Sequence, residues 1–425
     1  MKKATKINLQ LKIIAINTTT NPLDWPLSSL PEGGRDGSSQ DRLRPNRHPS
    51  PTPPFTRDTT GVHLSNFNLL KAIGRGLTGY VYKATAIGIP GIPDGQLVAL
   101  KAIPKRKLDT PKLLEHLRRE QECCIDLSTS GSPYIPKLLC SFHNETHVFL
   151  CFEHVNGGEL ADQMKAKPGG HFSEPETVQI AAAVIAALET IHATGRIHRD
   201  IKPRNILVKV DPDTKTGTPS LIDYGFSKDH DKGSETKTLC FTPMYAAPEA
   251  LCDGSSSKAS DVWSLGVLIF KMLTSCLPIL VQPKDQANVM LVLKKIYTYL
   301  DEGLFCEKAI LTAIDSMALL SADAKDLLSK ILVRDPADRL SIAEIKAHPF
   351  FKVIDWDTIN DEGSTATFDV EEVFVRSKSL GEVGNSRIEN LSAKKPVIAS
   401  PKHTEETEEE DPFKGFTWTS DSLTC

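Results

Sequence analysis

Residues 198–205 read His-Arg-Asp-Ile-Lys-Pro-Arg-Asn and place an acid, a cation and an amide in one short run. Asp200 can accept a proton from a substrate hydroxyl, Lys202 can neutralise a phosphate, and Asn205 can bind a metal ion through its carbonyl oxygen. Phosphoryl transfer needs these three tasks performed close together, because its catalysis consists mostly of positioning and charge neutralisation. The run therefore predicts phosphoryl-transfer chemistry around Asp200.

A second acid, Asp223, follows the strand-like run Ser-Leu-Ile at 220–222 and precedes Tyr224 and a glycine. The Mg²⁺ ion prefers oxygen ligands and keeps several of its waters. Asn205 and Asp223, together with oxygens of ATP, are therefore sufficient as its predicted ligands.

The run 73–81 carries the pattern Gly-x-Gly-x-x-Gly-x-Val between two strand-like segments. Glycine lets a backbone approach phosphate groups without a Cβ in the way. A dinucleotide-binding fingerprint would need a helix directly after the glycines, whereas a strand-like run follows here; a plain glycine hairpin is the other alternative. Lys101, which ends the run Val-Ala-Leu-Lys, favours phosphate binding. The predicted nucleotide loop comprises Ile73, Gly74, Arg75, Gly76, Leu77, Thr78, Gly79, Tyr80 and Val81.

The elements that must position these groups change character along the chain. A proline-rich stretch at 17–60 is predicted to be disordered, because it cannot bury enough apolar surface to offset its ordering entropy. Runs rich in β-branched and aromatic residues and bounded by Gly and Pro then predict strands. Farther along the chain, apolar residues recur with a helical period and predict helices. The sequence thus predicts an α+β fold with a small β-rich lobe and a larger helical lobe. The expected strands are 67–73, 80–84, 97–101, 137–142 and 147–152, and the expected helices are 111–127, 177–194, 261–273, 285–300 and 322–333.

Composition narrows the class of protein further. The 425 residues are 40% hydrophobic and 24% charged, and the net charge of −4 gives no basic field that would favour nucleic acid. Nine cysteines occur without a Cys-x-x-Cys pair, so neither a zinc site nor a disulfide framework is predicted. No apolar stretch approaches the roughly 20 residues that span a bilayer. We expect a cytoplasmic location that also extends to the nucleus.

Six runs of the chain resemble, in their order, the motifs of protein kinases. They are the glycine loop, Val-Ala-Leu-Lys, the His-Arg-Asp run, Asp-Tyr-Gly, Ala-Pro-Glu at 247–249 and Asp-Val-Trp-Ser-Leu-Gly at 261–266. The resemblance covers residues 67–351 and implies the bilobal kinase fold. It implies an N-lobe at 67–152, a hinge at 153–158 and a C-lobe at 159–351. Residues 1–66 then form an N-terminal extension and 352–425 a C-terminal tail.

The resemblance also assigns roles at the nucleotide site. Glu120 is expected to pair with Lys101, because a buried lysine needs an anionic partner and the spacing is that of kinases; Glu122 lies on another helix face. Glu153, Val155 and Glu159 are expected to contact ATP. Asp200, Lys202, Asn205 and Asp223 are the implied catalytic residues, with ATP and Mg²⁺ as cofactors, and Glu249 is expected to pair with Arg339.

Two segments near the C-terminus are similar to the AGC group of kinases, which includes the cyclic-AMP-dependent and ribosomal-S6-kinase families. They are the domain join at 348–356 and the aromatic run at 413–418. The group implies phosphorylation sites at Thr238, Ser400 and Thr417. His116, Arg199 and Lys228 are expected to bind the phosphate on Thr238. Phe368 and Asp369 are expected to lean on the nucleotide site.

Substrate selection is expected to depart from the group. The Glu159 carboxylate can bind an arginine of the substrate, but Arg204 and Lys271 occupy positions where those kinases often carry acidic residues. Two cations there would repel an arginine two residues before the acceptor. We expect weaker selection for basic peptides than the group norm.

The favoured interpretation is an active, monomeric serine/threonine kinase that acts on protein substrates and is itself a substrate of an upstream kinase. A pseudokinase scaffold is the alternative, but it would usually have lost Lys101, Asp200 or Asp223, and all three are present. A kinase of the calcium/calmodulin-related group is a second alternative. It would more often carry a basic amphipathic helix after the domain.

Overall fold

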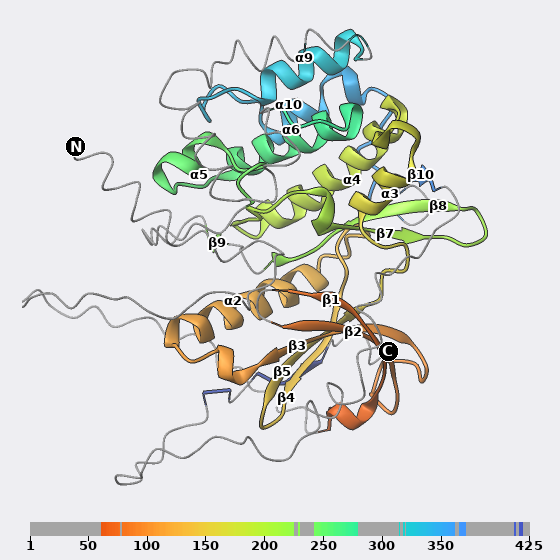
Figure 1. Cartoon of the computed structure of the whole chain (residues 1–425), viewed down its shortest axis with the longest axis vertical. Helices are drawn as coiled ribbons and strands as arrows, with labels where there is room; N and C mark the ends of the chain where they lie inside the picture. Colours follow the sequence, from red (N-terminus) through yellow and green to blue (C-terminus); the bar gives the residue numbers. More distant parts are fainter. Residues whose placement is uncertain are drawn as a thin grey trace, which may run out of the picture.

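The computed structural model describes residues 61–76, 79–224, 228–229, 242–278, 314, 318, 320–361, 365–370, 412–413 and 416–419. These residues form two lobes, one built on a β-sheet and one mainly helical (Figure 1). The proline-rich stretch and the expected helix at 285–300 lie outside the described residues. Among the described residues, no helix is long and apolar enough to cross a membrane.

The small lobe contains an antiparallel sheet with the strand order β1-β2-β3-β5-β4-β11. Five of these strands agree with the expected ones but end one to three residues later, and β4 also begins one residue later. The sixth, β11, comes from the C-terminal tail and pairs with β4, so that Trp418 faces Ser141. The strands are β1 (Phe67–Arg75), β2 (Tyr80–Ala86), β3 (Leu97–Pro104), β4 (Leu138–His143), β5 (His147–Glu153) and β11 (Trp418–Thr419).

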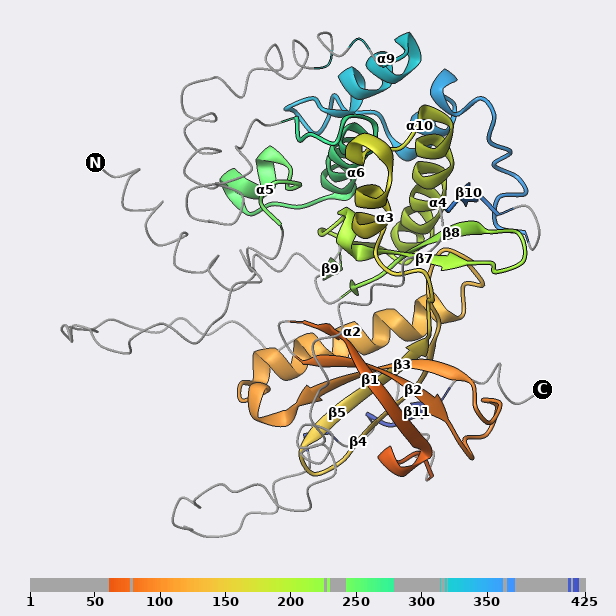
Figure 2. The same ribbon diagram turned by 45° about the vertical axis from the view of Figure 1, so that its right-hand side comes forward.

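Helix α2 (Pro111–Ser128) lies between this sheet and the helical lobe (Figures 1 and 2). Pro111 occupies its first turn, where the missing N–H costs nothing, and the Thr110 hydroxyl caps the helix by accepting from the Leu113 N–H. Leu117, Cys124 and Leu127 are buried against the core. The helix is therefore fixed at its start by local chemistry and along its length by packing.

The large lobe is built around two long helices, α4 (Glu174–Ala193) and α6 (Lys258–Thr274). Both begin three residues earlier than expected because serine side chains form capping boxes at their N-termini, at Ser173 and Ser257. The other helices are α3 (Leu160–Ala166), α5 (Pro248–Asp253), α9 (Ala322–Ile331) and α10 (Ile342–Lys346), with short 3₁₀ turns at Leu64–Asn66, Lys105–Lys107, Pro168–Gly170, Pro203–Asn205 and Pro349–Phe351.

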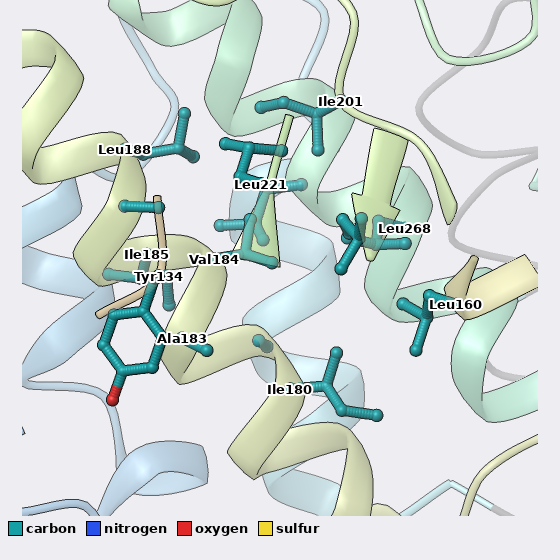
Figure 3. Close-up of a cluster of buried hydrophobic side chains, with 14 of the residues drawn as sticks. Tyr134, Leu160, Ile180, Ala183, Val184, Ile185, Leu188, Ile201, Leu221 and Leu268 are labelled. Atoms are coloured by element: carbon teal, nitrogen blue, oxygen red, sulfur yellow. The ribbon is translucent and has the colours of Figure 1, made fainter. Parts of the chain in front are cut away.

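The core of the large lobe has α4 near its centre, and apolar side chains cover this helix on most of its circumference (Figure 3). Ile180, Val184 and Leu188 are fully buried there. α6 approaches α9 closely at Gly266, where a Cβ would lie 2.5 Å from the Ile331 side chain. A larger residue at this position would overpack the junction.

Short strands carry the catalytic run and its neighbours in the large lobe. β7 and β8 form a hairpin, β10 extends it at the β8 edge, and β6 pairs with β9. Their bounds are β6 (Arg196–Ile197), β7 (Ile206–Val210), β8 (Thr216–Leu221), β9 (Lys228–Asp229) and β10 (Phe368–Asp369).

The start of the tail is packed on the kinase lobes. The Tyr134 hydroxyl donates to the Ile359 carbonyl at 2.7 Å and accepts from the Ala366 N–H at 2.7 Å. Phe368 pairs with Gly217 on β8 and its ring lies 5.5 Å from that of Phe172. Phe368 and Asp369 form β10 at the β8 edge, and their expected approach to the nucleotide site stays a prediction.

Candidate active site

Asp200 lies in the turn between β6 and the 3₁₀ segment Pro203–Asn205 and is almost fully buried. Its Oδ2 accepts from Lys202 Nζ at 2.5 Å and from Asn205 Nδ2 at 2.8 Å. Burial alone would raise the pKa of Asp200, but the ammonium of Lys202 and the hydrogen bonds hold this pKa below its ordinary value. The carboxylate is therefore ionised and ready to accept a proton.

Thr242 completes this network and was not among the expected site residues. Its hydroxyl donates to Asp200 Oδ1 at 2.6 Å and accepts from Lys202 Nζ at 2.8 Å. The Thr242 N–H also points at Asp200 Oδ1, at 3.2 Å. The only sequence signal was the Thr-Pro pair shortly before Ala-Pro-Glu. Thr242 thus ties the segment that precedes α5 to the catalytic carboxylate.

The catalytic run is held from below by Asp261 on α6. This buried carboxylate accepts from the backbone N–H groups of His198 and Arg199, each at 2.8 Å, and lies 2.8 Å from His192 Nε2. Burial would raise the pKa of Asp261, but these donors lower it. Arg199 has a left-handed backbone with φ of 70°, which costs energy in a non-glycine residue. The two N–H bonds to Asp261 hold that conformation in place.

Asp223 sits on the predicted sharp turn, with φ of 72°, and is exposed. The preceding residue, Ile222, donates its N–H to the Asn205 carbonyl at 2.9 Å, so the backbones that bear Asn205 and Asp223 are neighbours. Tyr224 is buried, donates its hydroxyl to the Leu221 carbonyl and packs edge-on against His198 at 5.9 Å. The hydroxyl, which a phenylalanine would lack, thus ties the turn to the end of β8.

Lys101 on β3 and Glu120 on α2 form an ion pair with a distance of 2.5 Å between Nζ and Oε1. Burial would lower the pKa of Lys101, but the carboxylates of Glu120 and Asp223 raise it above its ordinary value. Lys101 is therefore charged and faces both α2 and the metal-binding turn. The structure pairs Glu120, and not Glu122, with this lysine.

The three glycines of the nucleotide loop meet different constraints. A Cβ on Gly79 would lie 1.9 Å from the Ala102 carbonyl oxygen on β3, so only glycine fits there. A Cβ on Gly74 or Gly76 would meet nothing closer than 3.5 Å. Gly79 is therefore required by the close approach of the loop to β3, whereas a Cβ at Gly74 or Gly76 would make only ordinary van der Waals contacts. Leu77 and Thr78 lie outside the described residues.

The connection between the lobes supplies the other expected nucleotide contacts. Glu153 ends β5 and accepts from the Lys137 N–H at 3.2 Å, so its side chain braces β4. Among the described residues, none bonds the backbone N–H or C=O of Val155. Asn156 and Gly157 fasten the segment to β7. Glu159 follows at the N-cap of α3.

The same residues fit the implied cofactor. The side-chain amide of Asn205 donates through Nδ2 to Asp200, and within the described part of the chain no hydrogen bond ends on its Oδ1. Together with the exposed carboxylate of Asp223, this oxygen offers the hard donor type that Mg²⁺ prefers. Lys101, on the small lobe, would supply a cation for the phosphates.

Glu249 at the start of α5 and Arg339 form a bidentate ion pair. Arg339 Nη1 lies 2.8 Å from Glu249 Oε1, and Nη2 lies 2.7 Å from Oε2. The Arg339 side chain has no solvent exposure. The pairing expected across the large lobe is therefore present and fixes the position of α5.

The expected phosphate-binding residues are only partly described. His116 on α2 is half-buried; burial lowers its pKa, and the cations of Arg119, Lys112 and Arg199 lower it further. Lys228 lies on β9, whose pairing with Ile197 brings its backbone beside the catalytic run. Thr238 and Ser400 lie outside the described residues. Lys271 is half-buried on α6, and burial lowers its pKa.

The aromatic run of the tail binds the small lobe between α2 and β4. Gln121 Nε2 donates to the Phe416 carbonyl at 2.7 Å, and the Ser141 hydroxyl donates to the same oxygen at 2.9 Å. Phe413 and Phe416 are buried, and Lys105 Nζ lies 4.0 Å from the ring centroid of Phe413. Thr417 is half-buried beside this contact.

Comparison with known proteins places this site in a family. The protein kinase domain family matches residues 67–351. The chain is 32% identical over 319 residues to Protein kinase 3 of Dictyostelium discoideum, covering 72% of this chain and 31% of that protein. It is 33% identical over 303 residues to human Ribosomal protein S6 kinase alpha-2, covering 69% of this chain and 37% of that protein.

A third relative has a more similar length. The chain is 31% identical over 309 residues to cAMP-dependent protein kinase type 3 of Saccharomyces cerevisiae, covering 71% of this chain and 69% of that protein. The chain therefore spans about a third of the length of the first two relatives and about two thirds of the third.

The match and the site together show that the chain belongs to the protein kinase family. Its relatives and its tail place it more narrowly, among the serine/threonine protein kinases of the AGC type. The expected family, the bilobal α+β fold and the class of enzyme are confirmed.

Proposed function

We propose that this chain transfers the γ-phosphoryl group of ATP to serine or threonine hydroxyls of proteins through the residues around Asp200. The observation that carries the proposal is the Asp200 carboxylate, kept ionised by Lys202 and held in place by hydrogen bonds from Lys202 and Thr242. A substrate hydroxyl beside this carboxylate loses its proton to Asp200 as the new P–O bond forms. The β–γ P–O bond breaks, and ADP leaves with the electron pair.

The other residues neutralise the negative charge of the nucleotide and of the transferring group, or bind the rest of the nucleotide. Lys202 neutralises charge on the transferring group while it stays bonded to Asp200. Lys101, oriented by Glu120, holds the α- and β-phosphates. Asn205 and Asp223 would hold Mg²⁺, which neutralises charge on the phosphate oxygens when bound. Val155 would bind the base through its backbone, and Glu159 would bind the ribose.

A scaffold without chemistry is the alternative. It is disfavoured by the ion pair of Lys101 and Glu120 and by the ionised state of Asp200, because neither is needed for a fold that only binds partners. Transfer of radiolabel from ATP to a serine-peptide array distinguishes the two. We expect transfer by the wild-type chain and almost none by Asp223→Asn, since the variant loses a metal-binding carboxylate. Equal inactivity of both, even with phosphate on Thr238, would establish the scaffold.

We also propose that phosphate on Thr238 stabilises the active state. The support is the cluster of cations around His116, which adds to the effect of burial in lowering the pKa of that histidine; an anion would offset the repulsion among these cations. His116 lies on the same helix as Glu120, so a phosphate bound there would help to hold α2 against Lys101. Ser400 and Thr417 are proposed as further phosphorylation sites. Phosphate on Thr417 would reinforce the contact of the tail with α2.

Thr238→Ala is expected to lose most of the activity of the phosphorylated enzyme, because the cationic cluster then has no dianion to bind. The measurement is kcat for a serine peptide after treatment of both proteins with an activating kinase. Thr274→Ala, at the end of α6, is a matched control at a threonine away from the cluster. Full activity of Thr238→Ala would contradict the regulatory proposal and leave the transfer chemistry standing.

The remaining expectations are proposals as well. We propose that the enzyme is monomeric, that it works in the cytoplasm and also in the nucleus, and that an upstream kinase activates it. Its cysteines support a reducing compartment, since no disulfide is found among the described residues. Fluorescence microscopy of the tagged full-length chain tests the location, and light scattering tests the monomer.

A further inference from the structure

The first half of α2 and the turn that precedes it carry several cations. Lys105, Arg106 and Lys107 form the 3₁₀ turn, and Arg118 lies on α2. We call these side chains the basic surface; Arg106, Lys107 and Arg118 are exposed. Burial lowers the pKa of Lys107, and the cations of Arg75 and Arg106 lower it further. The cations therefore repel one another, and an anion bound among them would be favoured.

The described residues do not supply that anion to the two arginines of the basic surface. Neither Arg106 nor Arg118 forms an ion pair with an acid in the described part of the chain. The nearby acids are Asp109 after the 3₁₀ turn, Glu122 on α2 and Glu145 in the β4–β5 turn, and they form no ion pair with any described residue. The basic surface thus has charge left for a further anionic partner.

The C-terminal tail reaches the small lobe at this surface. Arg118 Nη2 donates to the Pro412 carbonyl at 2.7 Å. The next residue, Phe413, is buried with its ring centroid 4.0 Å from Lys105 Nζ. The run directly before Pro412, residues 405–411, contains six acids in seven residues and lies outside the described part of the chain. We call it the acidic run; its last residue is joined by one peptide bond to a residue held by Arg118.

This tether favours the acidic run over any other anion as the occupant of the basic surface. Seven residues extend at most about 25 Å from Pro412. A tether this short raises the effective concentration of the run at the surface to the order of millimolar. One exposed ion pair contributes little to stability, but several acids held beside several cations act together. An acidic peptide or a nucleic acid would have to displace this tethered segment.

We propose that the acidic run binds the basic surface of the same chain and thereby holds the aromatic run 413–418 on α2 and β4 without phosphate on Thr417. The contacts of Gln121 and Ser141 with the Phe416 carbonyl position the aromatic run; the acidic run adds a permanent electrostatic attachment before it. The inference concerns the attachment of the tail and does not depend on the proposed phosphoryl transfer.

The test measures hydrogen exchange by mass spectrometry in the full-length chain, treated with a phosphatase so that no phosphate supplies the charge. The readout is the exchange rate of the peptide that covers 412–419, because local detachment of the tail exposes its amides. For the wild type we expect exchange to become faster when KCl rises from about 0.05 M to about 0.5 M, since salt screens exposed charges. Peptides from the buried helix α4 report any general loss of folding.

Two variants remove one side of the contact each. The first combines Arg106→Glu with Lys107→Glu. The second replaces the acids of the run by amides: Glu405→Gln, Glu406→Gln, Glu408→Gln, Glu409→Gln, Glu410→Gln and Asp411→Asn. Each should speed exchange at 412–419 by about tenfold at low salt, because several weak pairs are lost together. The combination of both variants should exchange little faster than either alone, since each already removes the shared contact.

Lys137→Glu is the matched control. Lys137 is an exposed cation of the same lobe and directly precedes β4, at the end of that strand away from its turn with β5. This change alters the net charge of the lobe in the same direction as the variants of the basic surface. Exchange at 412–419 in Lys137→Glu should stay close to that of the wild type.

Wild-type exchange at 412–419 in either variant would overturn the inference, and so would effects of the two variants that simply add. Exchange that slows as the protein concentration rises would also overturn it, because the acidic run would then bind a second copy of the chain. Peptide phosphorylation is measured separately. Absence of transfer by a chain whose tail exchanges as expected would contradict the proposed function and leave this inference standing.

Discussion

Asp200→Asn is expected to lower kcat for a serine peptide by about 10²- to 10⁴-fold, the usual contribution of a positioned acid or base. The amide cannot take up the hydroxyl proton, and it has no charge to pair with Lys202 Nζ, now 2.5 Å from the carboxylate. The side chains are nearly equal in volume, so the buried site should stay filled.

Nucleotide binding separates this chemical effect from a loss of folding. Lys101 and Glu120 pair on the other lobe and do not touch Asp200, so the affinity for a fluorescent ATP analogue should stay close to that of the wild type. Asp211→Asn is the matched control, since Asp211 is exposed in the β7–β8 turn and accepts from the Asp213 N–H at 2.9 Å. A kcat for Asp200→Asn close to that of the control would contradict the role of Asp200 as proton acceptor.

The residues that carry the chemistry could be predicted because their types and order are local features of the chain. The run at 198–205 and the glycine pattern each lie within ten residues, and the strands that flank them have clear boundaries. Lys101 and Glu120 lie farther apart, yet the structure pairs them as expected. What the spacing could not supply is the pKa of each group, which depends on burial and on partners brought in by the fold.

Thr242 shows why part of the site could not be predicted. Its contact with Asp200 joins residues on different elements, and a threonine in a loop has no periodicity that reveals its partner. The pairing of β11 with β4 could not be predicted either, because a strand of two residues is too short to show a sequence pattern. The packing of Phe368 could not be predicted because its neighbour in the core, Phe172, precedes it by almost half of the chain.

Arg339→Met is expected to lower the free energy of unfolding by about 3–5 kcal/mol, the usual cost of removing one partner from a buried ion pair. The change leaves the Glu249 carboxylate without its cationic partner. It also removes the donors to the backbone carbonyls of Val333, Ala259 and Arg334, which accept from Arg339 at 2.8, 2.9 and 3.0 Å. Methionine fills much of the volume, so the loss measures charge and hydrogen bonding more than a cavity.

Urea unfolding followed by circular dichroism gives the free energies, and two further variants give the cause. Arg339→Lys keeps the charge but cannot present the planar fork, so it should fall between wild type and Arg339→Met. Lys165→Met removes a cation from an exposed pair, 2.7 Å from Asp162, and should cost no more than about 1 kcal/mol. Because Glu249 begins α5, directly after the segment that carries Thr242, kcat should fall together with stability in Arg339→Met. Equal stability of the Arg339→Met and Lys165→Met variants would show that the pair of Glu249 and Arg339 does not hold α5.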